Sequence, residues 1–242
     1  MKKTLYIVTL MSLTVLMTSC RAWYNTQMAD VPLLQGKGDV RLTGGVNTAM
    51  MFPYSLSGTA SVGVTDHIGV QLYGSYGDVD QYHFHGAGGY YTYLGESHWV
   101  LEAYGGAGMG STFNNAARDE EKKPIEERTA GDAVRFSYQQ YFCQLNVGMA
   151  DVTAVHFDFG LGLRAGVMPY TLKVNDRDQV VKYDENDVLP LFEPVAFVRI
   201  GTSVVKFQVQ VGTTALAFQE DRLHDAVAAM PFSLYGGLSF NF

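Results

Sequence analysis

The sequence predicts an all-β fold: a closed antiparallel up-and-down β-barrel of about ten strands, with eight as the alternative count. Three observations support this prediction. Apolar and polar residues alternate along most of the chain after residue 39, as in strands whose two faces meet different surroundings. The chain is rich in strand-forming aromatic residues, with 15 Tyr and 14 Phe, and has 26 Gly, which fit turns and crowded interiors. It also ends on an apolar strand, which a closed barrel does not leave as an edge.

The last strand, at residues 230–242, has one apolar and one polar face. The apolar positions are Met230, Phe232, Leu234, Leu238, Phe240 and Phe242. The polar positions are Ser233, Tyr235, Ser239 and Asn241. Alternating aromatic residues that finish in Phe242 resemble the C-terminal recognition signal of bacterial outer-membrane β-barrels. This resemblance implies the barrel-assembly machinery as a partner, through the last strand.

Nine further strands precede it. Their predicted bounds are 39–48, 54–65, 68–76, 82–94, 98–113, 134–149, 154–173, 192–200 and 204–218. Most reach the 9–11 or so residues that a tilted transmembrane strand needs. The connections near residues 66, 96, 151 and 202 are tight, and those near 80, 124, 182 and 223 are longer. Transmembrane barrels alternate in this way, with short turns in the periplasm and long loops outside. An even number of strands places both termini on the periplasmic side.

The N-terminus is predicted to be an export signal. Lys2 and Lys3 precede an apolar stretch at residues 5–17, which is too short for a membrane-spanning helix. The following residues, Met17-Thr18-Ser19-Cys20, resemble the lipobox of bacterial lipoproteins, although Met17 stands where Leu is usual. The resemblance implies acylation of Cys20; the alternative is an ordinary signal peptide that contains this cysteine. We therefore expect a signal peptide at 1–19, a lipid-anchored periplasmic tether at 20–38 and the barrel at 39–242.

The region from residue 39 to Phe242 as a whole resembles small outer-membrane β-barrels of the OmpA, OmpX and OmpW kind. The resemblance consists of a strand pattern and a terminal signature, and it contains no catalytic motif. It implies a Gram-negative outer membrane as the location and membrane lipid as a partner. The alternative architecture is an exported soluble β-sandwich.

Charge and cysteine content exclude two classes of protein. The formal net charge is −7 and no basic stripe is present, so a nucleic-acid partner is not expected. Cys20 and Cys143 are the two cysteines of the chain, and one lies in the export segment, so no disulfide framework is expected. Cys143 shares its strand face with apolar residues and is predicted to face lipid.

Seven charged residues fall on strand faces that are predicted to line the lumen. They are Arg41, Glu102, Asp158, Arg164, Glu193, Arg199 and Lys206. Opposite charges in a narrow lumen should pair, because an unpaired desolvated charge is costly. We expect a salt-bridge network that plugs the lumen together with Tyr73, Tyr104 and Tyr235. The alternative is a gated pore.

A second candidate site lies at residues 78–85. His83 and His85 are two residues apart on a strand and therefore share a face, while Asp78 and Asp80 lie on the preceding loop. Imidazole and carboxylate groups at this spacing could hold a divalent metal or form an acid–base pair. The alternative is a polar strand end without chemistry. No cofactor is predicted, and no residue is assigned a catalytic role.

These observations predict a non-enzymatic outer-membrane barrel with a plugged polar lumen. Its expected role is structural: it presents extracellular loops, with the charged loop 114–133 as a surface for a protein partner, as in an accessory subunit of an envelope complex. Two alternatives remain open. One is a narrow, porin-like passage for small solutes or hydrophobic ligands, and the other is a surface hydrolase that uses residues 78–85.

Overall fold

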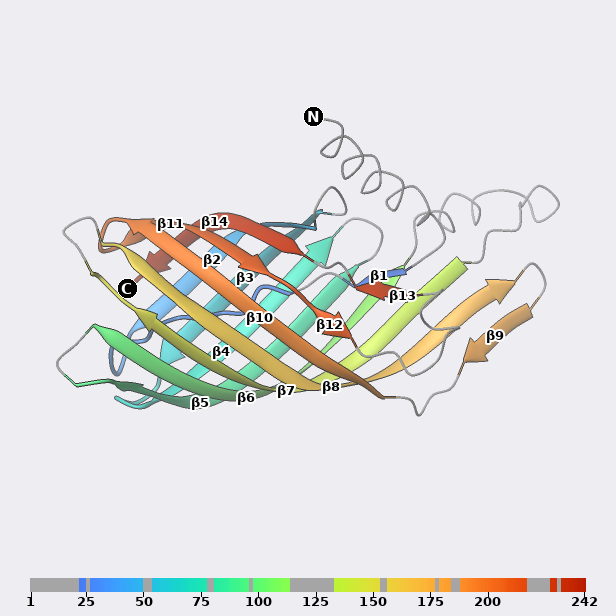
Figure 1. The fold of residues 1–242 in the computed structure, drawn as a ribbon, viewed down its shortest axis with the longest axis horizontal. Coiled ribbons are helices and arrows are strands. Elements are labelled where there is room, and N and C mark those ends of the chain that lie inside the picture. The colour runs from blue at the N-terminus through green and yellow to red at the C-terminus, as the bar shows by residue number, and fades with distance from the viewer. Residues whose placement is uncertain are drawn as a thin grey trace, which may run out of the picture.

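The computed structural model shows a closed, antiparallel, up-and-down β-barrel (Figure 1). It describes residues 22–24, 27–49, 54–77, 81–95, 98–113, 133–152, 156–176, 179–183, 188–216, 227–229 and 232–242. Ten strands among these residues form the wall. In chain order they are β2 (Val40–Ala49), β3 (Tyr54–Gly63), β4 (Ile68–Gly77), β5 (Tyr82–Tyr93), β6 (Trp99–Phe113), β7 (Ala133–Met149), β8 (Asp158–Asp176), β10 (Val188–Gly201), β11 (Val205–Gly212) and β14 (Ser233–Asn241).

The wall closes because its last strand pairs with its first. Strands β14 and β2 are antiparallel, with Asn241 opposite Arg41 and Ser233 opposite Ala49. Strand β8 pairs with β10 from Asp158 to Pro169, and β10 in turn pairs with β11. The predicted all-β barrel and the count of ten strands are confirmed, and the alternative of eight strands is wrong.

The barrel has two different ends. At the short-turn end, tight turns join β3 to β4, β5 to β6 and β10 to β11, and the longer connection 150–157 joins β7 to β8. The C-terminus also lies there, because Val40 and Phe242 exchange backbone hydrogen bonds of 2.9 and 3.0 Å. At the opposite, long-loop end lie the connections that include residues 114–132 and 217–226.

Three regions show the largest differences from the predicted strand bounds. The polar stretch expected to be a loop at 175–189 contains β9 (Gln179–Tyr183), which pairs only with β8, and the start of β10. Strand β8 begins at Asp158 rather than at residue 154, because Val152 N–H donates to Phe157 O and His156 has a positive φ of 47°. The predicted strand 204–218 is interrupted after Gly212, and β12 (Ala215–Leu216) continues the pairing with β10.

Side chains alternate between the lumen and the outer surface along the wall. Polar residues such as Ser61, Gln71 and Gln208 are buried inside. The outer face carries exposed large apolar side chains, which include Leu56, Leu72, Leu101, Met109, Leu145, Leu161, Val198, Val211 and Leu234. Within the part of the chain that the structure describes, no helix is long and apolar enough to cross a membrane.

The middle of the predicted tether lies inside the barrel. We expected residues 20–38 to form a tether outside the strands, but the side chains from Gln27 to Leu34 are all buried. These residues have no alternating pattern because they contact lumen side chains all around instead of pairing with a strand. The signal peptide expected at 1–19 and the acylated Cys20 lie outside the described residues.

Candidate functional site: a lumen filled by the N-terminal segment

Residues 27–35, which we call the plug segment, run through the lumen from one end to the other. Just before it, β1 (Ala22–Tyr24) pairs in parallel with β13 (Val227–Ala229), at the end of the barrel away from the C-terminus (Figure 1). Just after it, Gly38 N–H donates to Gly63 O at the short-turn end, at 2.7 Å. The chain therefore crosses the lumen before it enters β2.

Lumen side chains bind the backbone of the plug segment. Arg199 Nη2 donates to Val31 O at 2.6 Å, and Gln144 Nε2 donates to Asp30 O at 2.6 Å. Further contacts join Arg164 to Met28 O, Asn146 to Asp30 O, Glu102 to Leu34 N–H and Tyr93 to Leu34 O. An extended segment without a neighbouring strand has no backbone partners of its own, so these side chains take the place of a sheet.

One lumen side chain, Gln210, binds both the N–H and the C=O group of Ala29 in the plug segment. With its amide oriented to satisfy both neighbours, Gln210 donates to Ala29 O at 3.0 Å and accepts from Ala29 N–H at 3.1 Å. A single side-chain amide thereby reproduces the pair of bonds that a strand would supply. The lumen recognises the main chain of the plug segment over most of its length.

Two polar side chains of the plug segment fix its position in the barrel. Asp30 accepts a hydrogen bond from Ser61, which lies on β3. Gln27 Oε1 accepts hydrogen bonds from Tyr73 and Ser75 of β4, at 2.9 and 3.1 Å. Both sets of partners come from neighbouring strands, so the segment lies at a defined height and against a defined side of the wall.

Inward-facing glycines accommodate the apolar side chains of the plug segment. A Cβ at Gly69 would lie 2.6 Å from Leu34 Cδ1, and one at Gly162 would lie 3.1 Å from Val31 Cγ2. At Gly148 the added atom would come within 3.0 Å of Leu33 Cδ2. The wall thus lacks side chains at these positions because the plug segment occupies the space.

The charged lumen residues at the short-turn end are centred on Asp158. Lys206 Nζ binds its Oδ1 at 2.6 Å, and the guanidinium groups of Arg41 and Arg199 lie 3.6 and 3.8 Å from its Oδ2. Lys206 also binds Asp151 in the adjoining turn, at 2.7 Å. Partial burial disfavours ionisation of Asp151, but its hydrogen bond to Lys206 and that residue's charge outweigh it and lower the Asp151 pKa.

A second group of charges lies farther along the lumen and is centred on Arg164. This guanidinium pairs with Glu193 at 3.3 Å and donates to Gln144 Oε1 at 3.1 Å. Glu193 also accepts hydrogen bonds from Tyr24 and Thr214, at 3.1 and 3.0 Å. Of the predicted lumen charges, Glu102 contacts neutral groups, namely Leu34 N–H and the Asn146 amide.

The predicted histidine pair faces the lumen, where both rings are buried. Arginine can only donate, so Arg164 at 3.5 Å makes His85 Nε2 an acceptor and places the proton of His85 on Nδ1. That proton points to His83 Nε2 at 3.0 Å, and His83 Nδ1 then donates to Tyr138 Oη at 3.1 Å. Each ring nitrogen therefore already has a partner inside the barrel.

The metal and acid–base hypotheses for residues 78–85 gain no support from this geometry. Asp78 and Asp80 lie outside the described residues. Among the residues that the structure does describe, no group of three or more His, Cys, Asp or Glu side chains could hold a metal ion. A surface hydrolase needs accessible catalytic groups, whereas both histidines are enclosed by Tyr73, Tyr138 and Phe142.

The structure places all seven predicted charged residues and the three predicted tyrosines in the lumen, and Cys143 on the exposed outer face. Sequence reasoning missed the plug segment and the amides that bind it, Gln144, Asn146 and Gln210. Inward-facing glycines on several strands were the available signal, because they leave space that something must fill. No family model matches the chain, and no curated protein matches it.

The contact between Leu34 and Gly69 can be tested by mutation. Gly69→Val should lower the free energy of unfolding by about 1–3 kcal/mol, because it overpacks the lumen. Leu34→Ala should cost about 2–5 kcal/mol on its own. Combining them should cost less than the sum, since the smaller side chain makes room for the valine. The measurement is urea unfolding in detergent micelles.

The matched control is Gly88→Val, on neighbouring strand β5, where an added Cβ meets no atom within 4 Å. Its stability should stay within about 0.5 kcal/mol of the wild type. Strictly additive costs for Gly69→Val and Leu34→Ala would contradict the placement of Leu34 against this wall position.

The central role of Asp158 predicts an unequal effect of two similar substitutions. Asp158→Asn should cost about 3–5 kcal/mol, because it leaves the buried Arg41, Arg199 and Lys206 without their shared counter-charge. Asp151→Asn should cost less than about 1 kcal/mol, because this carboxylate lies in a partly exposed turn. Lys206→Met in the Asp158→Asn background should restore part of the loss. Equal losses for the two asparagine variants would rule out Asp158 as the centre of the network.

Proposed function

We propose that this protein is a non-enzymatic outer-membrane barrel whose lumen is closed by its own N-terminal segment and whose role is to present its long loops to a partner. The observation that carries the proposal is the combination of an apolar outer surface with a filled lumen. A soluble barrel hides apolar side chains inside, whereas this wall places polar groups inside and Leu, Val and aromatic residues outside.

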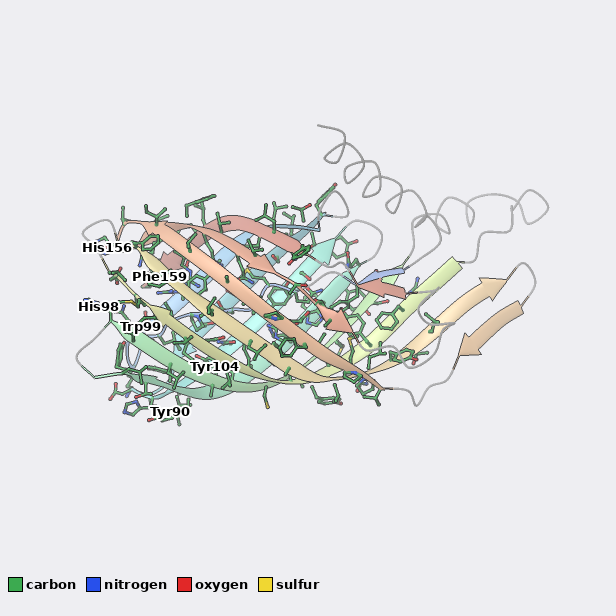
Figure 2. All side chains as sticks on the ribbon, viewed as in Figure 1. Tyr90, His98, Trp99, Tyr104, His156 and Phe159 are labelled. Carbon is green, nitrogen blue, oxygen red and sulfur yellow. The ribbon has the colours of Figure 1, made fainter. Side chains whose placement is uncertain are left out.

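The aromatic residues on the outer face support a membrane location. Exposed Tyr90, Trp99 and Phe207 lie at strand ends on the short-turn side, where Trp99 packs edge-on against Phe159 (Figure 2). Exposed tyrosines also occur at the opposite strand ends, at Tyr54, Tyr76 and Tyr82. Two aromatic girdles that flank an apolar band are typical of barrels in bilayers.

The height of the band agrees with a bilayer. Strand β4 runs from Ile68, which pairs with Tyr90 of one girdle, to Tyr76 of the other. At about 3.3 Å per residue and a tilt of about 40°, this stretch rises roughly 20 Å along the barrel axis. Between the girdles, Leu72 is 65% exposed and Leu161 is 58% exposed. In water, this much contiguous apolar surface would promote aggregation.

A filled lumen favours a structural role over transport. Tyr73, Tyr104 and Tyr235 are buried, and the plug segment occupies the space between them and the charged residues. Opening a path would require breaking the backbone contacts of Asp30 and Val31 and the ion pairs around them. The gated pore therefore has no observation in its favour.

The remaining parts of the proposal concern partners. Loop 114–133 joins β6 to β7 at the long-loop end and is the proposed surface for a protein partner, as in an accessory subunit of an envelope complex. The last strand, whose Phe242 side chain is 68% exposed, is the proposed contact with the barrel-assembly machinery. Membrane lipid would cover the outer band.

Substitution on the outer face distinguishes a bilayer from water. Leu72→Arg should destabilise the protein in lipid vesicles by about 2–4 kcal/mol, because it places a charge on the lipid-facing midplane. Ser203→Arg, in an exposed turn outside the band, is the control and should change stability by less than about 0.5 kcal/mol. Both are measured by the temperature of the heat-induced shift on gels. A harmless Leu72→Arg would point to a soluble barrel.

The filled lumen predicts a silent protein in planar bilayers. The wild type should give no discrete conductance steps, because the plug segment and the charged groups leave no continuous aqueous path. A heat-induced gel shift of the same preparation controls for folded protein. Discrete steps in the wild type that grow in Arg164→Ala or Glu193→Ala would instead support a narrow pore.

A further inference from the structure

We propose that the N-terminal end of the mature chain leaves the barrel at the long-loop end, opposite to the C-terminus, so that any group attached at Cys20 is presented on the side of the long loops. This differs from the expectation of a periplasmic tether, which places both termini on one side. Which side of the membrane this end faces rests on the proposed membrane location. That β1 and the long loops lie at the same end of the barrel does not.

Tyr24, at the end of β1, lies in a buried cluster near the long loops. Its ring packs into a buried cluster with Phe136, Tyr138, Tyr170 and Leu172, and it meets Tyr138 edge-on with 5.4 Å between ring centroids. All four partners belong to the halves of β7 and β8 nearest the long loops. The Tyr24 hydroxyl also donates to Glu193. Tyr24 is therefore held at the long-loop half of the lumen.

The residues just before the plug segment pair with a strand at the long-loop end. Ala22, Trp23 and Tyr24 lie opposite Val227, Ala228 and Ala229 in a parallel pair. Strand β13 belongs to the connection between β11 and β14, which is at the long-loop end. Figure 1 shows β1 and β13 side by side at this end, with the C-terminus at the other.

The opposite end of the plug segment is held at the short-turn end. Lys37 N–H donates to Asp66 at 3.2 Å, and Gln35 Nε2 donates to Asp151 at 3.3 Å. Asp66 and Asp151 both lie in connections of the short-turn end. Leu34 lies against the wall at Gly69, near the first residue of β4 at the same end. The segment has one direction through the barrel, from the long-loop end to the short-turn end.

Chain length then limits where Cys20 can lie. One residue, Arg21, lies between Cys20 and Ala22, so the two Cα-to-Cα steps that join them span at most roughly 7 Å when fully extended. The wall between the two girdles rises roughly 20 Å, as the strand geometry requires. The Cys20 backbone therefore cannot reach the membrane surface at the short-turn end while β1 is paired. An acyl chain on this cysteine would insert into the leaflet on the side of the long loops.

Cysteine reporters test the side on which the chain emerges. In a Cys143→Ala background, Ala22→Cys, Lys122→Cys and Ser203→Cys report on β1, the long loop and a short turn. An impermeant maleimide on intact cells should label Ala22→Cys together with Lys122→Cys, and should label Ser203→Cys only after permeabilisation. The background protein without added cysteines corrects for labelling of Cys20 itself.

The outcomes separate this proposal from the proposed function. If Lys122→Cys is protected and Ser203→Cys is labelled, the barrel orientation is wrong, yet Ala22→Cys must still follow Lys122→Cys for the present proposal to stand. Labelling of Ala22→Cys together with Ser203→Cys would overturn it in either orientation.

A cross-link in purified folded protein gives a test that needs no intact membrane. Trp23→Cys with Ala228→Cys, in the same background, places two cysteines at facing positions of neighbouring strands, where the Cα separation allows a disulfide. Oxidation should shift the protein on a non-reducing denaturing gel. The control pair, Trp23→Cys with Ser203→Cys, should not shift. A shift in the control pair alone would show that β1 lies at the short-turn end.

Discussion

The structure depends on one constraint: an extended segment inside a barrel has buried peptide groups that no strand can pair. An unsatisfied buried N–H or C=O costs free energy comparable to a lost hydrogen bond. The lumen meets this cost with side chains whose shape suits peptide groups, the amides of Gln144 and Gln210 and the guanidinium of Arg199. The polar composition of the inner wall follows from what it encloses as much as from the barrel itself.

The same constraint explains why the charged residues are not simply a network of ion pairs. Arg199 contacts both Asp158 and the carbonyl of Val31, and Glu102 accepts from the N–H of Leu34. These groups balance charge and bind the plug segment at once. Removing one of them therefore disturbs the segment as well as the charge balance, which makes the lumen a cooperative unit.

The sequence predicted the wall well and its contents poorly. Strict alternation identifies the inward face, so Arg164 and Glu193 could be placed in the lumen without knowledge of their partners. The spacing of His83 and His85 likewise places them on one face, but the partner Tyr138 comes from a different strand and has no sequence signature. The plug segment has no alternating pattern because it contacts many strands. Strand β9 was not predicted because it lies in a polar stretch and pairs with the end of β8, past the last residue of β8 that pairs with β10.

The two ends of the lumen are closed by different chemistry. Asp158 and the cations around it close the short-turn end. The positions of these groups are tightly constrained, because an unpaired buried charge costs several kcal/mol. Around Tyr24, aromatic and aliphatic side chains close the long-loop end, where contact is non-directional and roughly proportional to buried area. A displacement at the long-loop end must break the Tyr24–Glu193 hydrogen bond as well as the apolar contacts, and one at the short-turn end must break the bond to Val31 O from the Arg199 guanidinium, which also lies near Asp158.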